Sequence, residues 1–391
     1  MHSYTGPGSP AEGASHVHGI FNTHMKRHLV LPLSLAVLAA NCGAGAAAAE
    51  ASGLRFGHGN WELACDNTRT CRAAGYHAEG ASDDENEDGD KPPMPVSVLL
   101  TRQAGPHTPV KGELQIGNPG EEQETDRLPP KLDLTMRING QPHGRVLISQ
   151  GKWTVDLAPQ QTQALLAALA RDSRIEWTNG KLSWRLSDKG AAAVLLKMDA
   201  YQGRLGTPGA LVRKGTRDEN GVLPALPAPV VNAVVPDDKV IQLPKARLAS
   251  LRAALKAQSE EECQALTGAG EAENEITVRR LGNGKLLAST LCWRGAYNQG
   301  DAYWVINASP PYAPELVTSS ASGYAAGVID GSQKGRGVGD CWAFEDWTWD
   351  GRRFVHTSEG NTGECNGIAP GGAWSLPTLV TTVRKQAASR P

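Results

Sequence analysis

The stretch WELACDNTRTCRAAGYH, residues 61–77, decides how the rest of the chain can be read. It places Cys65 and Cys71 on either side of a short segment that starts with Asp-Asn-Thr, which is typical of turns. A redox pair has two intervening residues at the start of a helix, where the thiol pKa falls. Zinc would need two more ligands at comparable spacing, and His77 is the obvious nearby candidate. The stretch therefore predicts a disulfide across a hairpin tip, with a metal or redox site as the alternative.

Upstream of this stretch the sequence has the pattern of a secretory signal peptide. A basic segment at residues 25–28 precedes an apolar run at 29–40, which is shorter than the ~20 residues that span a membrane. Small residues at 46–49 then form a cleavage pattern. We predict export to the periplasm with cleavage after Ala49, and we interpret residues 1–24 as an over-called start or a tag.

A lipid anchor at Cys42 is the alternative to a soluble periplasmic protein. This cysteine ends a run of small residues, as a lipidated cysteine does, but Asn41 occupies a position where Gly, Ala or Ser is expected. No later stretch is apolar enough to span a bilayer. We therefore expect no transmembrane segment.

Six cysteines, an even number, follow the predicted cleavage site. In an oxidising compartment this favours three disulfides, because paired thiols are joined there. Many connectivities are formally open to six cysteines. Proximity in the sequence favours Cys65 with Cys71, Cys263 with Cys292, and Cys341 with Cys365.

Strand patterns dominate the chain and helices are few, which predicts the α+β class. A run rich in proline and valine lies at residues 222–239 and suits an extended connection. We expect two β-rich domains, at residues 50–215 and 241–388, that are joined by a Pro-rich linker at 216–240 and stapled by disulfides.

Local signals place several elements in the first domain. Strands are expected at 96–102, 131–140 and 144–149. Helices are expected at 159–173 and 187–202, the second with Ser187 as its N-cap, and Asn-Gly predicts a hairpin at 174–186.

In the second domain, a helix at 245–262 is expected to precede a hairpin of strands 275–281 and 285–293. A later hairpin at 344–357 should turn at Asp-Gly. Its tryptophans Trp347 and Trp349 would share one face, because strand side chains alternate.

Charge gives no sign of a polyanionic partner. The chain has 39 Lys and Arg against 41 Asp and Glu, a net charge of −2, and its basic residues are scattered, so nucleic-acid binding is not expected. An acidic run at 82–93 imitates the start of a calcium loop from Asp84. Its twelfth position is Pro95, where calcium would need a bidentate Glu, so we interpret the run as a solvated loop.

Four longer motifs carry a resemblance, at residues 61–76, 186–215, 292–300 and 337–354. Their sequences are WELACDNTRTCRAAGY, LSDKGAAAVLLKMDAYQGRLGTPGALVRKG, CWRGAYNQG and GVGDCWAFEDWTWDGRRF. Together they resemble an exported proteobacterial family catalogued as domain of unknown function eleven-seventy-six. The first domain is also distantly similar to the invasion-associated locus B family. The resemblance implies a periplasmic two-domain protein with paired cysteines and no known reaction, so it supplies no catalytic residue.

Motifs of several enzyme classes are absent from the sequence, which contains no G-x-S-x-G, H-E-x-x-H or P-loop pattern. One cluster could supply acid–base chemistry, because His356 stands among carboxylates near the last hairpin. The carboxylates are Asp340, Glu345, Asp346, Glu359 and Glu364. A periplasmic hydrolase using this cluster is the alternative function, and no cofactor or metal is expected.

A non-catalytic binding or interaction protein is the function that we expect from the sequence. Exposed indoles beside carboxylates stack on sugar rings or hold a partner's apolar side chains, so an envelope glycan is one ligand class. The alternative is that the indoles fill a core that is short of phenylalanine. The predicted binding surface comprises Trp342, Trp347, Trp349, Asp350, His356 and Trp374.

Overall fold

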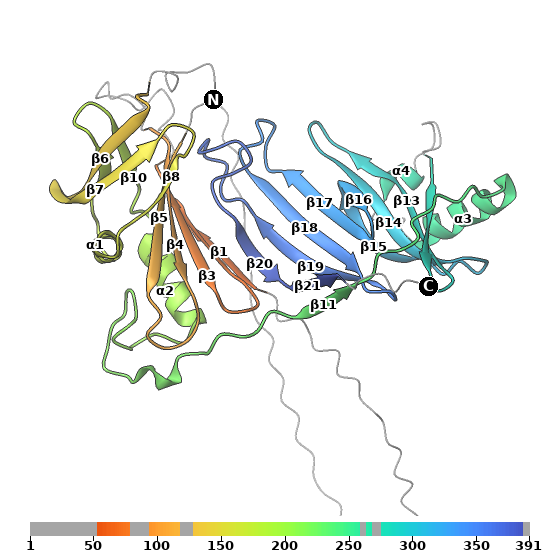
Figure 1. The fold of residues 1–391 in the computed structure, drawn as a ribbon, viewed down its shortest axis with the longest axis horizontal. Coiled ribbons are helices and arrows are strands. Elements are labelled where there is room, and N and C mark those ends of the chain that lie inside the picture. The colour runs from red at the N-terminus through yellow and green to blue at the C-terminus, as the bar shows by residue number, and fades with distance from the viewer. Residues whose placement is uncertain (1–52, 79–93, 118–127, 259–262, 268–274, 386–391) are drawn as a thin grey trace, which may run out of the picture. The chain divides into compact units, whose positions relative to one another are not determined.

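The computed structural model describes residues 53–78, 94–117, 128–258, 263–267 and 275–385 (Figure 1). All of these described residues belong to one compact unit. The predicted signal peptide, the alternative anchor at Cys42 and the acidic run at 82–93 lie outside the described residues.

The first sheet has six strands in the order β1-β2-β3-β4-β5-β8, and each pairs antiparallel with its neighbours. Strand β3 is central, so nearly all of its residues are buried. The strands are β1 Leu54–His58, β2 Trp61–Cys65, β3 Cys71–Tyr76, β4 Val96–Arg102, β5 Val110–Ile116 and β8 Thr154–Asp156.

A second sheet, in the order β10-β9-β6-β7, and two helices complete the N-terminal half. One hydrophobic core joins both sheets and both helices, and three fully buried indoles, Trp61, Trp177 and Trp184, lie in it. The elements are β6 Lys131–Ile138, β7 Gln141–Ser149, β9 Ile175–Thr178, β10 Ser183–Leu186, α1 Pro159–Leu169 and α2 Ala191–Tyr201.

The start of α2 differs from the expectation. Ser187 does not cap the helix; its hydroxyl accepts a hydrogen bond from the Lys189 amide, and the N-cap is Gly190 with a φ of 94°. A Cβ at Gly190 would overlap the carbonyl oxygen of His58, so both the backbone conformation and the close approach require glycine.

In the C-terminal half, the sheet β12-β13-β14-β15 is buried on both faces. Leu251 and Leu255 of α3 pack on one face with Trp304, while Tyr303 and Trp347 lie in the core on the other face. This is why the predicted strand 285–293 carries apolar residues at six of its nine positions. The elements are α3 Lys245–Gln258, α4 Gln264–Thr267, β12 Thr277–Gly282, β13 Lys285–Arg294, β14 Gln299–Asn307 and β15 Glu315–Ala321.

The last sheet runs β16-β17-β18-β19-β20, and the predicted Trp hairpin forms its β18 and β19. Asp350 closes that hairpin, because its Oδ1 accepts hydrogen bonds from the amides of Arg352 and Arg353. The strands are β16 Gly323–Ala325, β17 Val328–Lys334, β18 Trp342–Trp349, β19 Phe354–Asn361 and β20 Leu376–Val380.

Residues between the two halves run as an extended segment after the short 3-10 turn η2, Glu219–Gly221. Within it, β11 Val230–Ala233 pairs in parallel with β21 Thr382–Lys385 near the end of the described chain. The division into two domains with a linker at 216–240 stays a prediction.

All three predicted disulfides are confirmed. Cys65–Cys71, Cys263–Cys292 and Cys341–Cys365 are bonded, with Cα atoms 4.0, 4.7 and 4.9 Å apart. The fold is thus a β-rich, disulfide-stapled α+β structure, as expected.

Buried Asp66 organises the turn that the first disulfide closes. It is only 2% exposed, its Oδ1 accepts the amide hydrogens of Thr68 and Thr70 at 2.9 and 3.2 Å, and its Oδ2 binds Arg72 at 2.8 Å. The next residue, Asn67, exchanges two hydrogen bonds with the backbone of Val380 in β20. The turn therefore joins the first sheet to the last.

We predict that the double variant Cys65→Ser, Cys71→Ser folds and loses about 2 kcal/mol of unfolding free energy. The matched variant Cys341→Ser, Cys365→Ser should lose about 3 to 4 kcal/mol, because its disulfide closes a longer segment, 24 against 6 residues. Urea unfolding followed by tryptophan fluorescence measures both. A Cys65/Cys71 variant that is unfolded without urea would contradict the prediction.

Candidate functional site

Strands β18 and β19 bring four of the singled-out side chains together. In their antiparallel register Glu345 is opposite Glu359, and Trp347 is opposite His356, with an irregularity between Asp346 and Trp347. Directly opposed residues of an antiparallel pair lie on the same face of the sheet. We name the group formed by Glu345, Trp347, His356 and Glu359 the His356 face.

Stacking on an indole holds the His356 ring. The two ring centroids of His356 and Trp347 are 5.1 Å apart and the planes are 19° from parallel. Trp347 is only 9% exposed, so it forms a floor beneath a half-buried imidazole. The His356 Nε2 is buried and accepts or donates no hydrogen bond within the described residues.

Negative charge dominates this face. Burial raises the pKa of the Glu345 carboxyl above its usual value, and the neighbouring Glu359 and Asp346 raise it further, while His356 opposes them. Burial also raises the pKa of Asp346, with Asp330 adding to the effect and His356 opposing it. A group that offers hydrogen-bond donors or positive charge would relieve this repulsion.

One basic side chain borders the His356 face. Arg55 of β1 lies 3.6 Å from a carboxylate oxygen of Glu359, and both side chains are close to half exposed. Exposed pairs of this kind contribute little to stability. Glu345 forms no such ion pair within the described residues.

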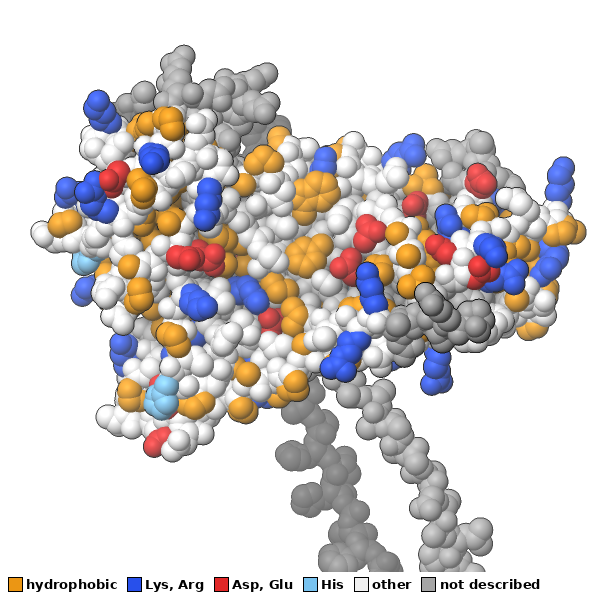
Figure 2. All heavy atoms as spheres, viewed as in Figure 1, with side chains coloured by type: hydrophobic (Ala, Val, Ile, Leu, Met, Phe, Trp, Pro, Cys, Tyr) orange, Lys and Arg blue, Asp and Glu red, His pale blue; other side chains and the backbone are white. Residues whose placement is uncertain are grey.

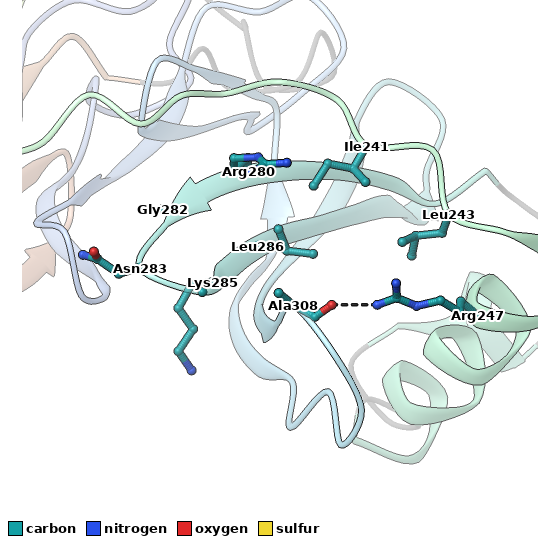
Figure 3. A pocket seen from close by; sticks show the side chains of 10 residues that line it. Ile241, Leu243, Arg247, Arg280, Gly282, Asn283, Lys285, Leu286 and Ala308 are labelled. Atoms are coloured by element: carbon teal, nitrogen blue, oxygen red, sulfur yellow. Dashed lines mark hydrogen bonds between the residues drawn. The ribbon is translucent and has the colours of Figure 1, made fainter.

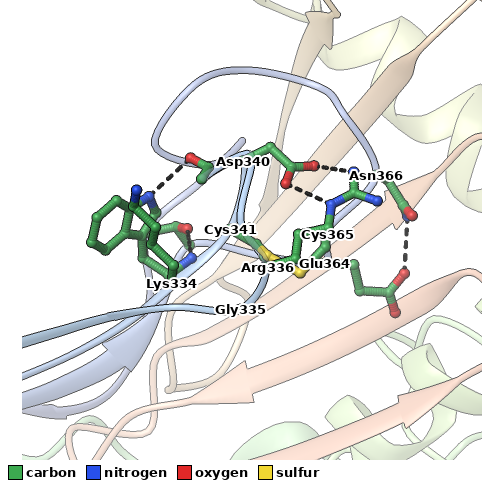
Figure 4. Close-up of a disulfide and its surroundings, with 12 residues drawn as sticks. Lys334, Gly335, Arg336, Asp340, Cys341, Glu364, Cys365 and Asn366 are labelled. Atoms are coloured by element: carbon green, nitrogen blue, oxygen red, sulfur yellow. Dashed lines mark hydrogen bonds and ion pairs between the residues drawn. A yellow bond between two sulfur atoms is a disulfide. The ribbon is translucent and has the colours of Figure 1, made fainter. Parts of the chain in front are cut away.

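The other two predicted carboxylates, Asp340 and Glu364, lie beside the Cys341–Cys365 disulfide (Figure 4). Arg336 donates two hydrogen bonds to Asp340, and these hydrogen bonds lower the pKa of that carboxyl. The carboxylate of Glu364 accepts a hydrogen bond from Asn366 at 3.1 Å. The six-membered cluster expected from the sequence is therefore divided between two places.

Metal-ligating atoms converge at one point of the described chain. Only Asp340, Cys341 and Cys365 bring three such atoms within 4.8 Å of one another among the residues that the structure describes. Both cysteines are joined in a disulfide and offer no thiolate, and Asp340 is paired with Arg336. The geometry is that of a staple next to an ion pair.

The remaining tryptophans of the predicted binding surface differ in their surroundings. Trp349 is 1% exposed and packs against Phe354 in the core. Trp342 is half-buried, with its indole NH bonded to the Gly339 carbonyl, and Trp374 donates to the hydroxyl of Ser97 at 2.7 Å. Trp349 can therefore serve packing alone, while the binding role of the others stays a prediction.

A buried charge network in the N-terminal half was not found from the sequence. Asp199 and Arg204 are fully buried, and Arg102 lies 3.6 Å from Asp199. Burial raises the pKa of Asp199, and burial together with Arg204 lowers the pKa of Arg102 to about 10. Asp199 also accepts the amide hydrogen of Leu211 at 2.6 Å, so the network fixes the irregular segment after α2. Its one sequence signal is a carboxylate on the apolar side of a predicted helix.

These features define a β-rich, disulfide-stapled protein whose chemically reactive side chains are mostly engaged in structural contacts. The family model described as "Protein of unknown function (DUF1176)" matches residues 55–381, so the chain belongs to that family. This confirms the resemblance found in the four sequence motifs.

A relative in Escherichia coli strain K12, the uncharacterized protein YpfG, is 25% identical over 357 residues. The alignment covers 83% of this chain and 91% of YpfG. No solved structure matches the chain. In the described part of the chain, no helix has the length and apolarity needed to cross a membrane.

We predict that Glu345→Gln flattens the dependence of stability on pH. Because the folded-state pKa of Glu345 is raised, its contribution to stability is fully present below its ordinary value of 4.5 and is lost as the pH rises through the raised pKa. The variant cannot ionise there and should lose less stability over that window.

Urea unfolding at a series of pH values from 4 to about 8 measures this effect. The control is Glu315→Gln, which removes the same charge from an exposed position on β15. Equal pH dependence in Glu345→Gln and the unmodified protein would show that burial of this carboxyl does not affect folding.

Proposed function

We propose that this protein is an exported, non-catalytic binding protein of the cell envelope, and that the His356 face is its binding surface. The observation that carries the proposal is the stacked Trp347–His356 pair, which is bordered by Glu345 and Glu359 on the same face. A flat ring next to hydrogen-bond acceptors suits a ligand that has both an apolar face and hydroxyl or amide donors. A glycan strand of the envelope has this chemistry.

Export is supported by two independent features of the chain. The basic and apolar segments before Ala49 have the pattern of a signal peptide. Three disulfides are also typical of chains that fold in an oxidising compartment. The periplasm is therefore the proposed location, and an anchor at Cys42 is the alternative.

The hydrolase alternative has less support from the arrangement of these residues. Three ligand or acid–base atoms do not converge within 4.8 Å at His356 in the described residues. The ring is also held by packing on Trp347, and no described carboxylate hydrogen-bonds to its buried Nε2. A general base needs an accessible nitrogen within reach of the substrate proton.

We predict that the native protein from the cell envelope begins at Glu50 and is lighter than its reduced form by the six hydrogens of three disulfides. Intact mass spectrometry before and after reduction with alkylation measures both quantities. A lipidated start at Cys42, or an uncleaved chain, would contradict the proposed location.

We predict that purified soluble muropeptides bind to the protein and change its tryptophan fluorescence, because Trp347 lies directly beneath His356. Glu345→Gln and His356→Ala should each weaken binding by about 10-fold, the usual effect of losing one hydrogen bond to a charged group or one ring contact. The control variant is Glu113→Gln, which removes another partly buried carboxylate with a raised pKa from β5 in a different sheet.

Two results would overturn the glycan proposal. One is unchanged fluorescence at millimolar muropeptide concentrations. The other is equal binding by Glu345→Gln, His356→Ala and Glu113→Gln. Turnover of the muropeptides that is abolished by His356→Ala would instead support the hydrolase.

A further inference from the structure

A second feature of the C-terminal half has the opposite electrostatic character. A surface cavity of about 310 Å³, open to solvent on one side, lies between the segment that leads into α3, the β12–β13 hairpin and the end of β14 (Figure 3). Apolar side chains of Ile241, Leu243, Leu286 and Ala308 line part of it. Cavities of a few hundred Å³ with an apolar lining and a few polar groups are usual sites for small ligands.

Three basic side chains line the same cavity, and two of them have no acidic partner among the residues that the structure describes. Arg247 donates to the carbonyl of Ala308 at 2.7 Å, as Figure 3 shows, and contacts the Tyr312 hydroxyl at 3.5 Å. Lys285 donates to the Asn307 side-chain oxygen at 3.0 Å. Neither forms an ion pair within the described residues. Both cations therefore donate hydrogen bonds to neutral oxygens and have no counter-ion there.

The third basic residue, Arg280, is partly neutralised. Its Nε lies 3.6 Å from a carboxylate oxygen of Asp237, and both side chains are well exposed. Asp237 also pairs with Lys239 at 3.3 Å, so its single negative charge is shared between two cations. The lining residues themselves include no acid, and their side chains carry a net positive charge.

Helix α3 adds to this positive potential. It begins at Lys245, two residues after the lining residue Leu243, so its N-terminal end borders the cavity. The N-terminus of a helix carries a partial positive charge and unpaired amide groups, which favour anions. At 14 residues the helix is long enough for this effect.

The ligand must match both parts of the lining. An inorganic anion would satisfy the cations but would leave the surfaces of Ile241, Leu243 and Leu286 in contact with water. An uncharged hydrocarbon would leave the half-buried Arg247 without a counter-ion. Figure 2 shows that acidic, basic and apolar side chains mix across the visible surface, so the cavity differs from that surface in lacking acids.

We propose that this cavity binds a small organic anion with an apolar body, such as a carboxylate or a phosphate monoester on a short alkyl chain. Arg247 holds the anionic group, Lys285 adds positive charge from the edge of the cavity, and the apolar side chains cover the alkyl chain. This site uses different residues from the His356 face and does not depend on the function proposed for that face.

Isothermal titration calorimetry of the full mature chain tests the proposal with three probes. Decanoate carries both an anionic group and an apolar body, decanol carries only the apolar body, and inorganic phosphate only the charge. We expect decanoate to bind at least about 10-fold more tightly than either of the others, because each of them lacks one half of the match.

Variants then locate the site. Arg247→Gln and, independently, Lys285→Gln should each weaken decanoate binding by about 10-fold, while decanol binding should not change. Lys256→Gln is the matched control, because it removes the same charge from an exposed position on α3 outside the cavity. Thermal unfolding verifies that each variant is folded, and Lys285→Gln serves if Arg247→Gln is not.

Equal affinities for decanoate and decanol would overturn the proposal, since binding would then be apolar alone. Equal losses of decanoate affinity in Lys256→Gln and Lys285→Gln would also overturn the proposal, since they would indicate non-specific attraction between charges. If inorganic phosphate binds as tightly as decanoate, the site recognises the anionic group alone, and the proposal of a ligand with an apolar body is wrong.

Discussion

The buried carboxylate of Asp66 is the constraint on which the relation between the first and last sheets depends. A charge that is only 2% exposed must be matched by donors, and the turn provides them from its own backbone and from Arg72. The resulting conformation directs Asn67 to the backbone of Val380. The side-chain amide of Asn67 donates to the Val380 carbonyl and accepts the Val380 amide hydrogen, as a paired strand would. The disulfide at Cys65 and Cys71 limits how far this turn can open.

Further contacts extend the same junction. Tyr76 donates to Glu62 at 2.6 Å and accepts the Glu364 amide hydrogen at 3.0 Å, so a buried phenol connects β2 and β3 to the loop after β19. Burial raises the pKa of Glu62 and raises that of Tyr76 well above 10. The Cys341–Cys365 disulfide holds the residue next to Glu364 in place. Two staples that are distant in sequence therefore support one interface.

Sequence periodicity predicted the elements whose signals are local. Pro159 marked the start of α1, Asn-Gly marked the hairpin of β9 and β10, and Asp350 marked the turn after β18. The strands β1, β8 and β16 were missed, because at 5, 3 and 3 residues each is too short to show a clear alternation. The parallel pairing of β11 with β21 was also missed, because no local pattern relates residues 230–233 to residues 382–385.

Candidate sites were predictable from the sequence where their residues lie in one hairpin, and not where they come from separate elements. The Asp-Gly turn predicted the hairpin, so Trp347 and His356 were correctly placed in one hairpin, although its register irregularity was not predicted. The separation of Asp340 and Glu364 from them depends on where the loops at each end turn. The basic cavity has no sequence signature at all. Arg247, Arg280 and Lys285 come from a helix and two strands, and their convergence exists only in the folded chain.

The pairing of β11 with β21 has a consequence for how the chain matures. Synthesis proceeds from the N-terminus, so β11 has no partner until β21, about 150 residues later, has been made. Asn67 likewise has no partner until Val380 has been made. Neither contact can form before residues 380–385 have been synthesised. Pairings between residues so far apart in sequence form slowly, so β11 and the Asp66 turn gain their contacts with the C-terminal half late in folding.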